Sequence, residues 1–450
     1  MMSKLSEDQV SSAKSDIERR TMRKIFWRLM PIIALGSAFN NVDRSNIGFA
    51  AIKMNRELGL TAAQFGFAAG IFYLSYVVFC IPGNMIGFKV GLRKWLPATM
   101  VAWGLCSMAT ALATNAAELG LIRLLLGAAE AGFVPGAMFL IGLWVPDRYR
   151  GRFVACFWVS TSLAAVIASP LSAYILTFDE IGGLRSWQML FVAEAAPVCL
   201  IGLVGFWLLH DNPTKAKWLS SEELGWLMEQ QGRDPRMEVQ TQTGLPDLRE
   251  FGNARVALLS VAFFLYMTTG ISFSFFLPSY LSSRGISIVS IGVVLTCVHF
   301  MGVVGHLAWG RWSDYMSHNR QLVCFAATLI VAVALCLLPL FSGLVLVTVL
   351  ACATQMGLAG TMTSFWPMPM AAVRATAAAG VLAGIAMLGN LTGLIGPYFT
   401  GLLRDRTTSY VLSFTLLAIS SALAGGLILA SRLQGSDSAD RSRLVPRVIH

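Results

Sequence analysis

Residues 321–366 read QLVCFAATLIVAVALCLLPLFSGLVLVTVLACATQMGLAGTMTSFW, and no charged residue occurs between Arg320 and Arg374. The stretch holds two apolar runs of about twenty residues, the length of a membrane-spanning α-helix. The whole chain of 450 residues continues this composition, with 56% hydrophobic residues, 13% charged residues and a mean hydropathy of +0.65. A soluble protein has roughly a quarter of its residues charged. The sequence therefore excludes a soluble globular protein and indicates a polytopic membrane protein.

Twelve apolar runs are long enough to cross a bilayer. They are predicted near residues 28–50, 64–87, 95–114, 118–145, 152–176, 187–209, 255–281, 288–309, 321–340, 343–366, 377–402 and 409–431. The longest connection, 210–254, follows the sixth run. We therefore predict an all-α membrane protein with twelve transmembrane helices in two six-helix bundles, 28–209 and 255–431. The segment 210–254 is the predicted linker, and residues 1–27 and 432–450 are the predicted tails.

The basic residues predict the orientation of the chain. With both termini in the cytoplasm, about 26 of the 34 Lys and Arg residues lie in cytoplasmic segments. The basic residues that face outward are then Lys53, Arg56, Arg185, Arg284, Arg404 and Arg406. The net charge of +10 is thus explained by topology in the inner (plasma) membrane, and we expect no nucleic acid as a partner.

The predicted linker contains the start signal of a short helix. Ser220 is followed three residues later by Glu223 and then by Leu224, Trp226 and Leu227. This capping-box pattern predicts an amphipathic helix at the inner membrane surface. We expect it to clamp the linker and to take no part in chemistry.

Charged residues inside the predicted spans are candidates for function, because each costs at least about 2.5–3.5 kcal/mol at bilayer depth. Arg123 and Glu130 lie nearly two helical turns apart, so both share one face at a separation of about 10 Å along the axis. Asp43 and Arg44 diverge by about 100°, so one faces the centre more squarely than the other. A structural ion pair is the alternative in each case.

Two acids and two arginines can couple a proton to an anion. Arg44 and Arg123 are the predicted ligands of a carboxylate, because the planar guanidinium binds it through two parallel hydrogen bonds. Asp43 and Glu130 are the predicted proton-coupling residues. Their protonation frees the arginines for the anion, and the departure of the anion favours deprotonation.

Polar and aromatic residues of other spans are predicted to line a substrate pocket. These residues are Phe39, Asn46, Tyr266, Phe273, Trp366 and Asn390. Packing or lipid contact is the alternative for each aromatic ring. Glu194 is interpreted as a structural carboxyl that satisfies the neighbouring helix ends. His299 and His306 are interpreted as helix-packing residues, because neither has a carboxylate in its own helix.

The stretch DRSNIGFA at residues 43–50 resembles the D-R-x-N-[IV]-G-F-A signature of the anion:cation symporter family of the major facilitator superfamily. The resemblance extends over nearly the whole chain, through residues 82–84, 187–197, 218–220, 389–391 and 396–398. It implies two six-helix bundles, alternating access, and proton-driven uptake of organic anions such as sugar acids, tartrate or phthalate-type aromatic acids. It also implies proton coupling and carboxylate binding at Asp43, Arg44, Arg123 and Glu130, and a substrate contact at Asn390.

One position departs from the superfamily pattern. The loop after the second helix usually carries an acidic residue where this chain has Phe88. Arg93 and Lys94 remain in the first half, and Asp314 is present in the second half. We expect these three residues to bias the conformation, with a weaker charge latch between the bundles on the Phe88 side.

These observations favour a proton-coupled symporter for a small organic carboxylate. An uncoupled or exchange-type anion carrier is the nearest alternative, and a channel or sensor is a further one. An enzyme is excluded, because no metal-binding cluster, nucleophile elbow or phosphate loop is visible and no large domain lies outside the membrane. The eight cysteines contain no CxxC pair, and we expect no cofactor or metal and a monomeric protein.

Overall fold

The computed structural model describes residues 2–231, 253–316, 319–370, 372 and 375–443. Parts of two predicted segments, linker residues 232–252 and tail residues 444–450, lie outside the described residues. Over the described residues the fold is all-α apart from one two-stranded hairpin.

The helices of the first half are α1 (Met2–Glu57), α2 (Ala62–Val90), α3 (Leu92–Ala109), η1 (Thr110–Leu112), α4 (Ala116–Glu130), α5 (Phe133–Trp144), α6 (Asp147–Thr177) and α7 (Ser186–Leu208). The hairpin between α6 and α7 consists of β1 (Glu180–Ile181) and β2 (Leu184–Arg185). The connection to the second half contains η2 (Pro213–Lys215) and α8 (Ser221–Gln231). The second half contains α9 (Ala254–Ser283), α10 (Ile288–Tyr315), α11 (Arg320–Leu337), η5 (Leu338–Leu340), α12 (Leu344–Phe365), α13 (Pro367–Met370), α14 (Ala375–Thr407) and α15 (Val411–Arg443).

Every predicted span coincides with a helix or a helix pair. Within the described ranges, 11 helical segments are long and apolar enough to cross a membrane. The first predicted span, 28–50, lies inside α1 but is not among these segments. Its polar stretch from Asn40 to Asn46 lowers the hydropathy of the helix, so the count of twelve spans stays a prediction.

Local sequence signals begin and interrupt the helices near the centre of the first bundle. The side chain of Asn115 accepts hydrogen bonds from the N–H groups of Ala117 and Glu118, both at 3.0 Å, and so caps α4. The predicted fourth span is divided into α4 and α5, with the break at Ala131 and Gly132. Because Pro135 has no N–H, it leaves the carbonyl of Ala131 without its helical donor.

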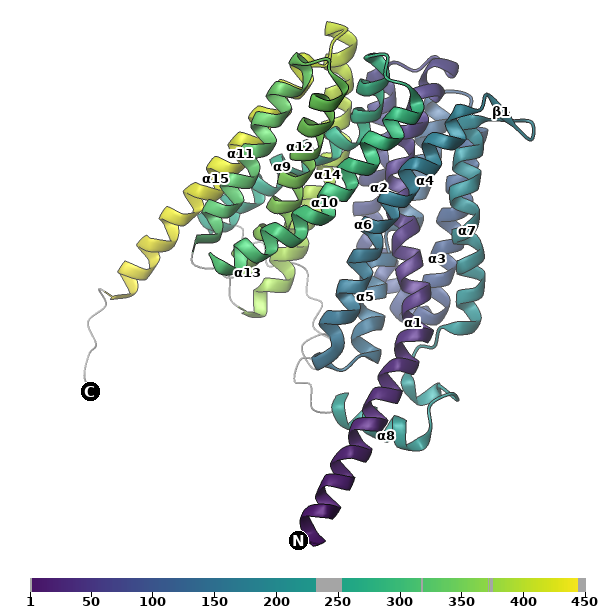
Figure 1. The fold of residues 1–450 in the computed structure, drawn as a ribbon, viewed down its shortest axis with the longest axis vertical. Coiled ribbons are helices and arrows are strands. Elements are labelled where there is room, and N and C mark those ends of the chain that lie inside the picture. The colour runs from purple at the N-terminus through teal and green to yellow at the C-terminus, as the bar shows by residue number, and fades with distance from the viewer. Residues whose placement is uncertain (1, 232–252, 317–318, 371, 373–374, 444–450) are drawn as a thin grey trace.

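The two bundles touch at one end of the molecule (Figure 1). There α2 packs on α14, α6 on α10 and α1 on α9. Gly66 and Gly70 of α2 lie so close to the backbone of α14 that a Cβ at either position would clash. The bundles diverge toward the end that holds the chain termini, α8 and α13 (Figure 1).

A helix, α8, lies at the position of the predicted linker helix. The N–H of Ser220 donates to Glu223 Oε2 at 2.9 Å, and the N–H of Glu223 donates to Ser220 Oγ at 3.2 Å. These reciprocal bonds are the predicted capping box. Lys24 of α1 donates to the same carboxylate at 2.8 Å and attaches α8 to the first bundle.

Candidate functional site

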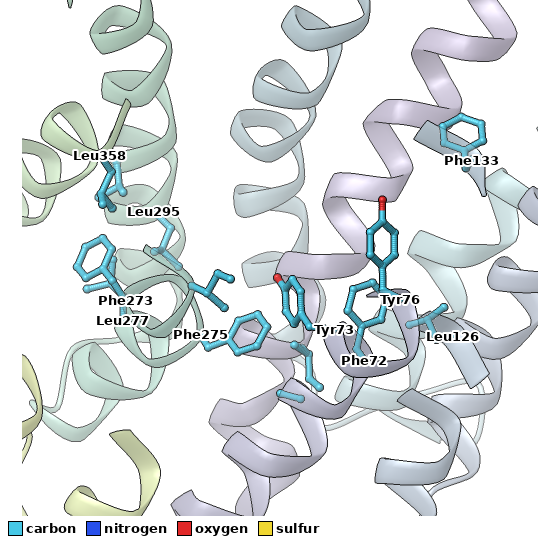
Figure 2. Close-up of a cluster of buried hydrophobic side chains, with 14 of the residues drawn as sticks. Phe72, Tyr73, Tyr76, Leu126, Phe133, Phe273, Phe275, Leu277, Leu295 and Leu358 are labelled. Carbon is cyan, nitrogen blue, oxygen red and sulfur yellow. The ribbon is translucent and has the colours of Figure 1, made fainter. Parts of the chain in front are cut away.

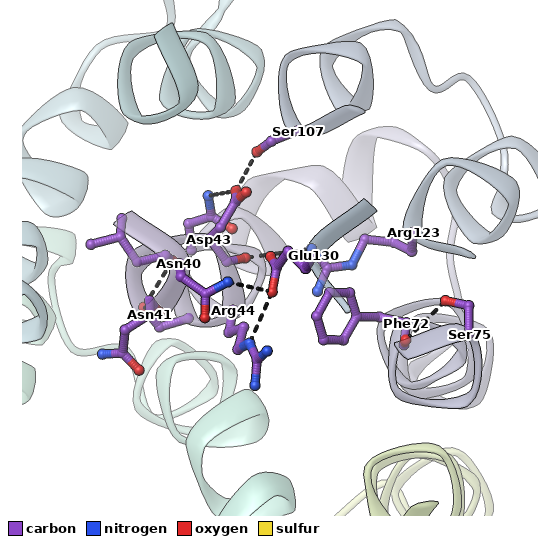
Figure 3. A network of polar contacts seen from close by, with 12 residues as sticks. Asn40, Asn41, Asp43, Arg44, Phe72, Ser75, Ser107, Arg123 and Glu130 are labelled. Carbon is purple, nitrogen blue, oxygen red and sulfur yellow. Dashed lines mark hydrogen bonds and ion pairs between the residues drawn. The ribbon is translucent and has the colours of Figure 1, made fainter. Parts of the chain in front are cut away.

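The polar stretch of α1 projects its side chains in two directions. Asp43 is buried and faces α3, where Ser107 Oγ donates to Asp43 Oδ1. Asn46, one turn further along α1, donates to the same oxygen at 3.2 Å. Arg44 extends instead toward α4 and α2. Figure 3 shows this divergence, which is the one expected for neighbours on a helix.

Glu130 is the last residue of α4, and its side chain is 0% exposed. Its Oε2 accepts a hydrogen bond from Asn40 Nδ2 at 2.8 Å and from Arg44 Nε at 3.1 Å (Figure 3). The Arg44 side chain is 23% exposed, so it is the partner in this ion pair that solvent reaches. Its Nη2 atom is buried and has no hydrogen-bond partner in the described part of the chain.

Arg123 is 1% exposed and has no carboxylate partner among the ion pairs of the described residues. Its Nη1 donates to the backbone carbonyl of Asp43 at 3.4 Å. Its Nε and Nη2 atoms are buried without hydrogen-bond partners in the same ranges. The guanidinium lies 5.1 Å from the ring centroid of Phe72. A buried guanidinium with two unused donors is costly, which makes it a candidate for binding an anion.

Aromatic residues of α2, which the sequence interpretation missed, lie against the two arginines. Arg44 lies 4.7 Å from the ring centroid of Tyr76 and 5.2 Å from that of Phe72. Figure 2 shows both rings beside Tyr73, whose ring centroid is 6.3 Å from that of Phe275 of α9. The spacing at 72, 73 and 76 places the rings within one helical turn, a signal that sequence alone does not distinguish from packing.

A glycine lets α4 approach these rings. A Cβ on Gly127 would clash with the carbonyl oxygen of Phe72 and the Oγ of Ser75. Small residues at such crossings let membrane helices pack closely. Gly127 therefore places Arg123 and Glu130 next to α2.

The remaining predicted pocket residues are not brought into this cluster. Phe39 is half-buried in α1. Tyr266 is buried in the second bundle and donates to the carbonyl of Leu358 at 3.0 Å. Phe273 is buried near Leu358 (Figure 2). Trp366 packs on Phe263 with ring centroids 5.0 Å apart.

Asn390 lies on α14 of the second bundle. Its Nδ2 donates to the carbonyl of Ala386 in the same helix at 2.9 Å, and the residue is half-buried. A role in binding for Asn390 or for the aromatic residues of the second bundle therefore stays a prediction.

The residues interpreted as structural have partners. Glu194 Oε1 of α7 accepts a hydrogen bond from Ser172 of α6 at 2.5 Å, whereas Glu194 Oε2 is buried without a partner in the described residues. His299 of α10 lies 3.0 Å from Ser169 of α6 and thereby links the two bundles. His306 lies 2.8 Å from Thr363 of α12.

The predicted conformational residues lie in different bundles, Arg93 and Lys94 in the first and Asp314 in the second. Arg93 and Lys94 are exposed at the start of α3, and the Arg93 N–H donates to Asp211 Oδ1 at 2.7 Å. Asp314 is exposed on α10 and pairs with Arg320 at 3.8 Å. Phe88 packs edge to face on Phe139, with ring centroids 4.6 Å apart. In the described residues, the contacts named above for Arg93, Asp314 and Phe88 all lie within one half of the chain, so the latch role stays a prediction.

The cluster of Asp43, Arg44, Arg123 and Glu130 has unused hydrogen-bonding capacity at every member. Asp43 Oδ2 and Glu130 Oε1 are buried without partners among the described residues, as are the guanidinium atoms named above. Buried polar atoms in proteins normally have partners, so this arrangement suits a ligand or protons that come and go. Within the same ranges, no group of three His, Cys, Asp or Glu side chains is placed to hold a metal ion.

Known proteins resemble this chain over most of its length. Residues 33–397 match the sequence profile of the Major Facilitator Superfamily. A putative tartrate transporter of Agrobacterium vitis is 34% identical over 425 residues, which cover 92% of each chain. The putative metabolite transport protein NicT of Pseudomonas putida is 32% identical over 403 residues, 88% of this chain and 92% of NicT.

Solved structures share the fold. The inward-facing, unoccupied crystal structure of a bacterial homologue of the human lysosomal transporter Spinster superposes with a TM-score of 0.77 at 18% identity. The superposition covers 91% of this chain and 97% of that one.

Proposed function

Because the chain belongs to the Major Facilitator Superfamily, we propose that it couples the inward movement of protons to the uptake of a small organic carboxylate. Its relatives are transporters, not enzymes, and they include proteins named for tartrate and metabolite transport. The family match and these relatives confirm the resemblance to the anion:cation symporter type that the sequence shows. The proposed substrates are sugar acids or aromatic and dicarboxylic acids, and tartrate, named for one relative, is a dicarboxylic acid.

The observation that carries the proposal is the ion pair of Glu130 with Arg44 beside the unpaired Arg123. Two acids and two arginines in one buried cluster are neutral together when both acids are ionised. Protonation of Glu130 removes the negative partner of Arg44 and leaves two guanidinium groups for a carboxylate. Glu130 and Asp43 are therefore the proposed proton-coupling residues, and Arg44 and Arg123 the proposed anion ligands.

The proposed cycle alternates between two states. In one state the acids are ionised and hold the arginines, as Glu130 holds Arg44 in the structure. In the other state the acids carry protons and the arginines carry the anion. Substrate and proton thus favour each other's binding. A proton neutralises the acid that competes with the substrate for the arginines, and a bound substrate occupies the arginines that would otherwise keep the acid ionised.

The proposed topology places α1 as the twelfth membrane span, with both termini and α8 in the cytoplasm of the inner (plasma) membrane. The excess of basic residues in these segments supports this orientation. The bundles touch at the end opposite α8. In the proposed orientation the structure is closed on the outer side and open toward the cytoplasm.

The alternative is an uncoupled or exchange-type carrier of the same anions. It requires the arginines but not the titration of Glu130 or Asp43. The two carriers differ in whether a pH gradient drives accumulation of the substrate.

Liposomes loaded with a pH-sensitive dye and containing the purified protein distinguish the two. A panel of sugar acids, dicarboxylates and aromatic acids is added outside, and protein-free liposomes correct for the leak of protonated acids through lipid. We expect one class of compound to acidify the interior only when protein is present. Exchange of labelled acid without acidification for any compound would contradict the proton coupling and leave the uncoupled carrier.

A further inference from the structure

A cavity of about 440 Å³ lies between the first bundle and the start of the linker. It is lined by Arg28 of α1, Arg93 of α3, and His210, Asp211, Lys217 and Trp218 of the linker. These positions lie at the ends of the first, third and sixth predicted spans, so the cavity is at the level of the membrane surface. It is remote from the charged cluster and independent of the proposed transport cycle. Its volume is in the range of small-molecule sites, about 300–1,000 Å³.

The lining is positively charged. Arg28, Arg93 and Lys217 are cations, and Asp211 is the single anion, so the net charge is +2 with His210 neutral. None of the three cations pairs with a carboxylate in the part of the chain described. The Asp211 carboxylate is engaged instead by the backbone N–H of Arg93. The cavity therefore offers three cationic groups to an anion.

Trp218 contributes a further unused donor. Its ring stacks on that of Trp144 with centroids 5.4 Å apart, and Arg28 lies 5.0 Å from its centroid. The Trp218 Nε1 atom is buried and has no hydrogen-bond partner within the described ranges. Trp144 Nε1, by contrast, donates to the carbonyl of His210 at 3.0 Å. An N–H without a partner, on a residue that lines a cationic cavity, is a candidate donor to an anionic oxygen.

The surroundings of the cavity favour a lipid as the source of that anion. Trp27 is 68% exposed beside Arg28 in the chain, and Trp207 is 71% exposed just before the linker. Exposed tryptophans are typical of the interface between membrane and water. Basic pockets at this depth bind the head groups of anionic lipids.

We propose that this cavity binds the phosphate group of an anionic phospholipid from the adjacent leaflet. The phosphate oxygens accept hydrogen bonds from the two guanidinium groups, the Lys217 ammonium and the indole N–H of Trp218. A bound lipid then joins α1, α3 and the linker by one anion.

Lipid binding to the purified full-length protein tests the proposal. After delipidation, retention of phosphatidylglycerol and of phosphatidylcholine is counted by native mass spectrometry, and the thermal unfolding midpoint is measured with each lipid. We expect phosphatidylglycerol to be retained and to raise the midpoint more than phosphatidylcholine does. Arg28→Gln with Arg93→Gln should weaken phosphatidylglycerol binding about fivefold for each cation removed.

Two further variants guard against misfolding and against general surface attraction. Trp218→Phe keeps an aromatic ring against Trp144 and removes the indole N–H together with part of the ring, and it should weaken binding while leaving the elution profile of the protein unchanged. Lys89→Gln with Arg152→Gln removes the same charge from the same end of the bundle outside the cavity, and it should bind as the wild type does.

Three results would overturn the proposal. An equal loss of binding in the Lys89 and Arg152 control would mean that the lipid is attracted by the surface alone. Unchanged binding in both the double variant and Trp218→Phe would mean that the lipid binds elsewhere. Protection by millimolar inorganic phosphate, with none by phosphatidylglycerol, would mean that the cavity takes free phosphate and not a lipid.

Discussion

Asp43 and Arg44 are neighbours in the chain but bond to different helices. Asp43 accepts from Ser107 of α3, and Arg44 donates to Glu130 of α4. A proton on Asp43 therefore changes the contact of α1 with α3, and a proton on Glu130 changes the contact of α1 with α4. In the proposed cycle, Asp43 thus serves the proton and Arg44 the anion.

The geometry of Arg44 gives a prediction at this scale. Arg44→Lys keeps the positive charge but loses the planar fork, so a bound carboxylate loses one of two parallel bonds. Because hydrogen bonds to charged groups contribute about 1.5–3 kcal/mol, substrate affinity should fall about 10- to 100-fold. Equilibrium binding of labelled substrate measures this, with Arg152→Lys at the exposed start of α6 as the control. Wild-type affinity in Arg44→Lys would remove Arg44 from the proposed site.

The charged residues of the site could be predicted from sequence, but their partners could not. Asp43, Arg44, Arg123 and Glu130 were evident because charge is rare in apolar spans. Ser107 was not, because a serine in a membrane helix usually bonds to its own backbone.

Some aromatic residues that were predicted to line the substrate pocket do not lie beside the charged cluster. Tyr266, which was predicted to line a pocket, donates its hydroxyl to the carbonyl of Leu358, and its role in binding stays a prediction. Phe72 and Tyr76, which were not expected, lie against Arg44. Membrane helices are apolar all round, so their sequences carry little information about which ring faces inward.

At the scale of elements, the crossing of α2 and α4 holds the site. Gly127→Ala places a methyl group against the carbonyl of Phe72 and the Oγ of Ser75. Overpacking of this kind costs about 1–3 kcal/mol, so the variant should unfold at a lower temperature and transport less. Gly120→Ala is the matched control in the same helix, because its Cβ meets nothing within 4 Å. Equal thermal unfolding of the two variants in detergent would show that the close crossing is not needed.

Element positions were predictable where the chain breaks its own pattern. The twelve apolar runs locate the helices, because an apolar stretch of about twenty residues has the length and composition of a membrane-spanning helix. The capping box at Ser220 located the start of α8. The extension of α1 to Met2 was not predicted, because the polar segment 1–27 has no apolar periodicity.

At the scale of the whole molecule, one carboxylate joins the two bundles at the closed end. Asp405 of α14 accepts hydrogen bonds from the N–H groups of Ala62 and Ala63 at 2.9 and 2.8 Å, at the start of α2. A carboxylate at a helix N-terminus is stabilising by about 0.3–1 kcal/mol. Asp405 therefore favours the state in which the bundles touch at this end.

Removing this contact should shift the conformational equilibrium. Asp405→Asn loses the charge and one acceptor, so the population with separated outer ends should rise by up to about fivefold. Double electron–electron resonance measures the distance between the two bundles, with spin labels at positions 180 and 283 of a variant without other cysteines. Asp179→Asn, which changes a carboxylate that pairs with Lys53 inside the first bundle, is the control. An unchanged distance distribution in Asp405→Asn would exclude a latch at this residue.

The central claim is that the buried carboxylates couple protons to the anion. The most direct measurement is substrate accumulation in proteoliposomes driven by a pH gradient, beside exchange of labelled substrate without a gradient, in the wild type, Asp43→Asn and Glu130→Gln. We predict that both variants lose accumulation and that exchange persists in part, because their arginines still bind the anion. Full accumulation in both variants would contradict the claim.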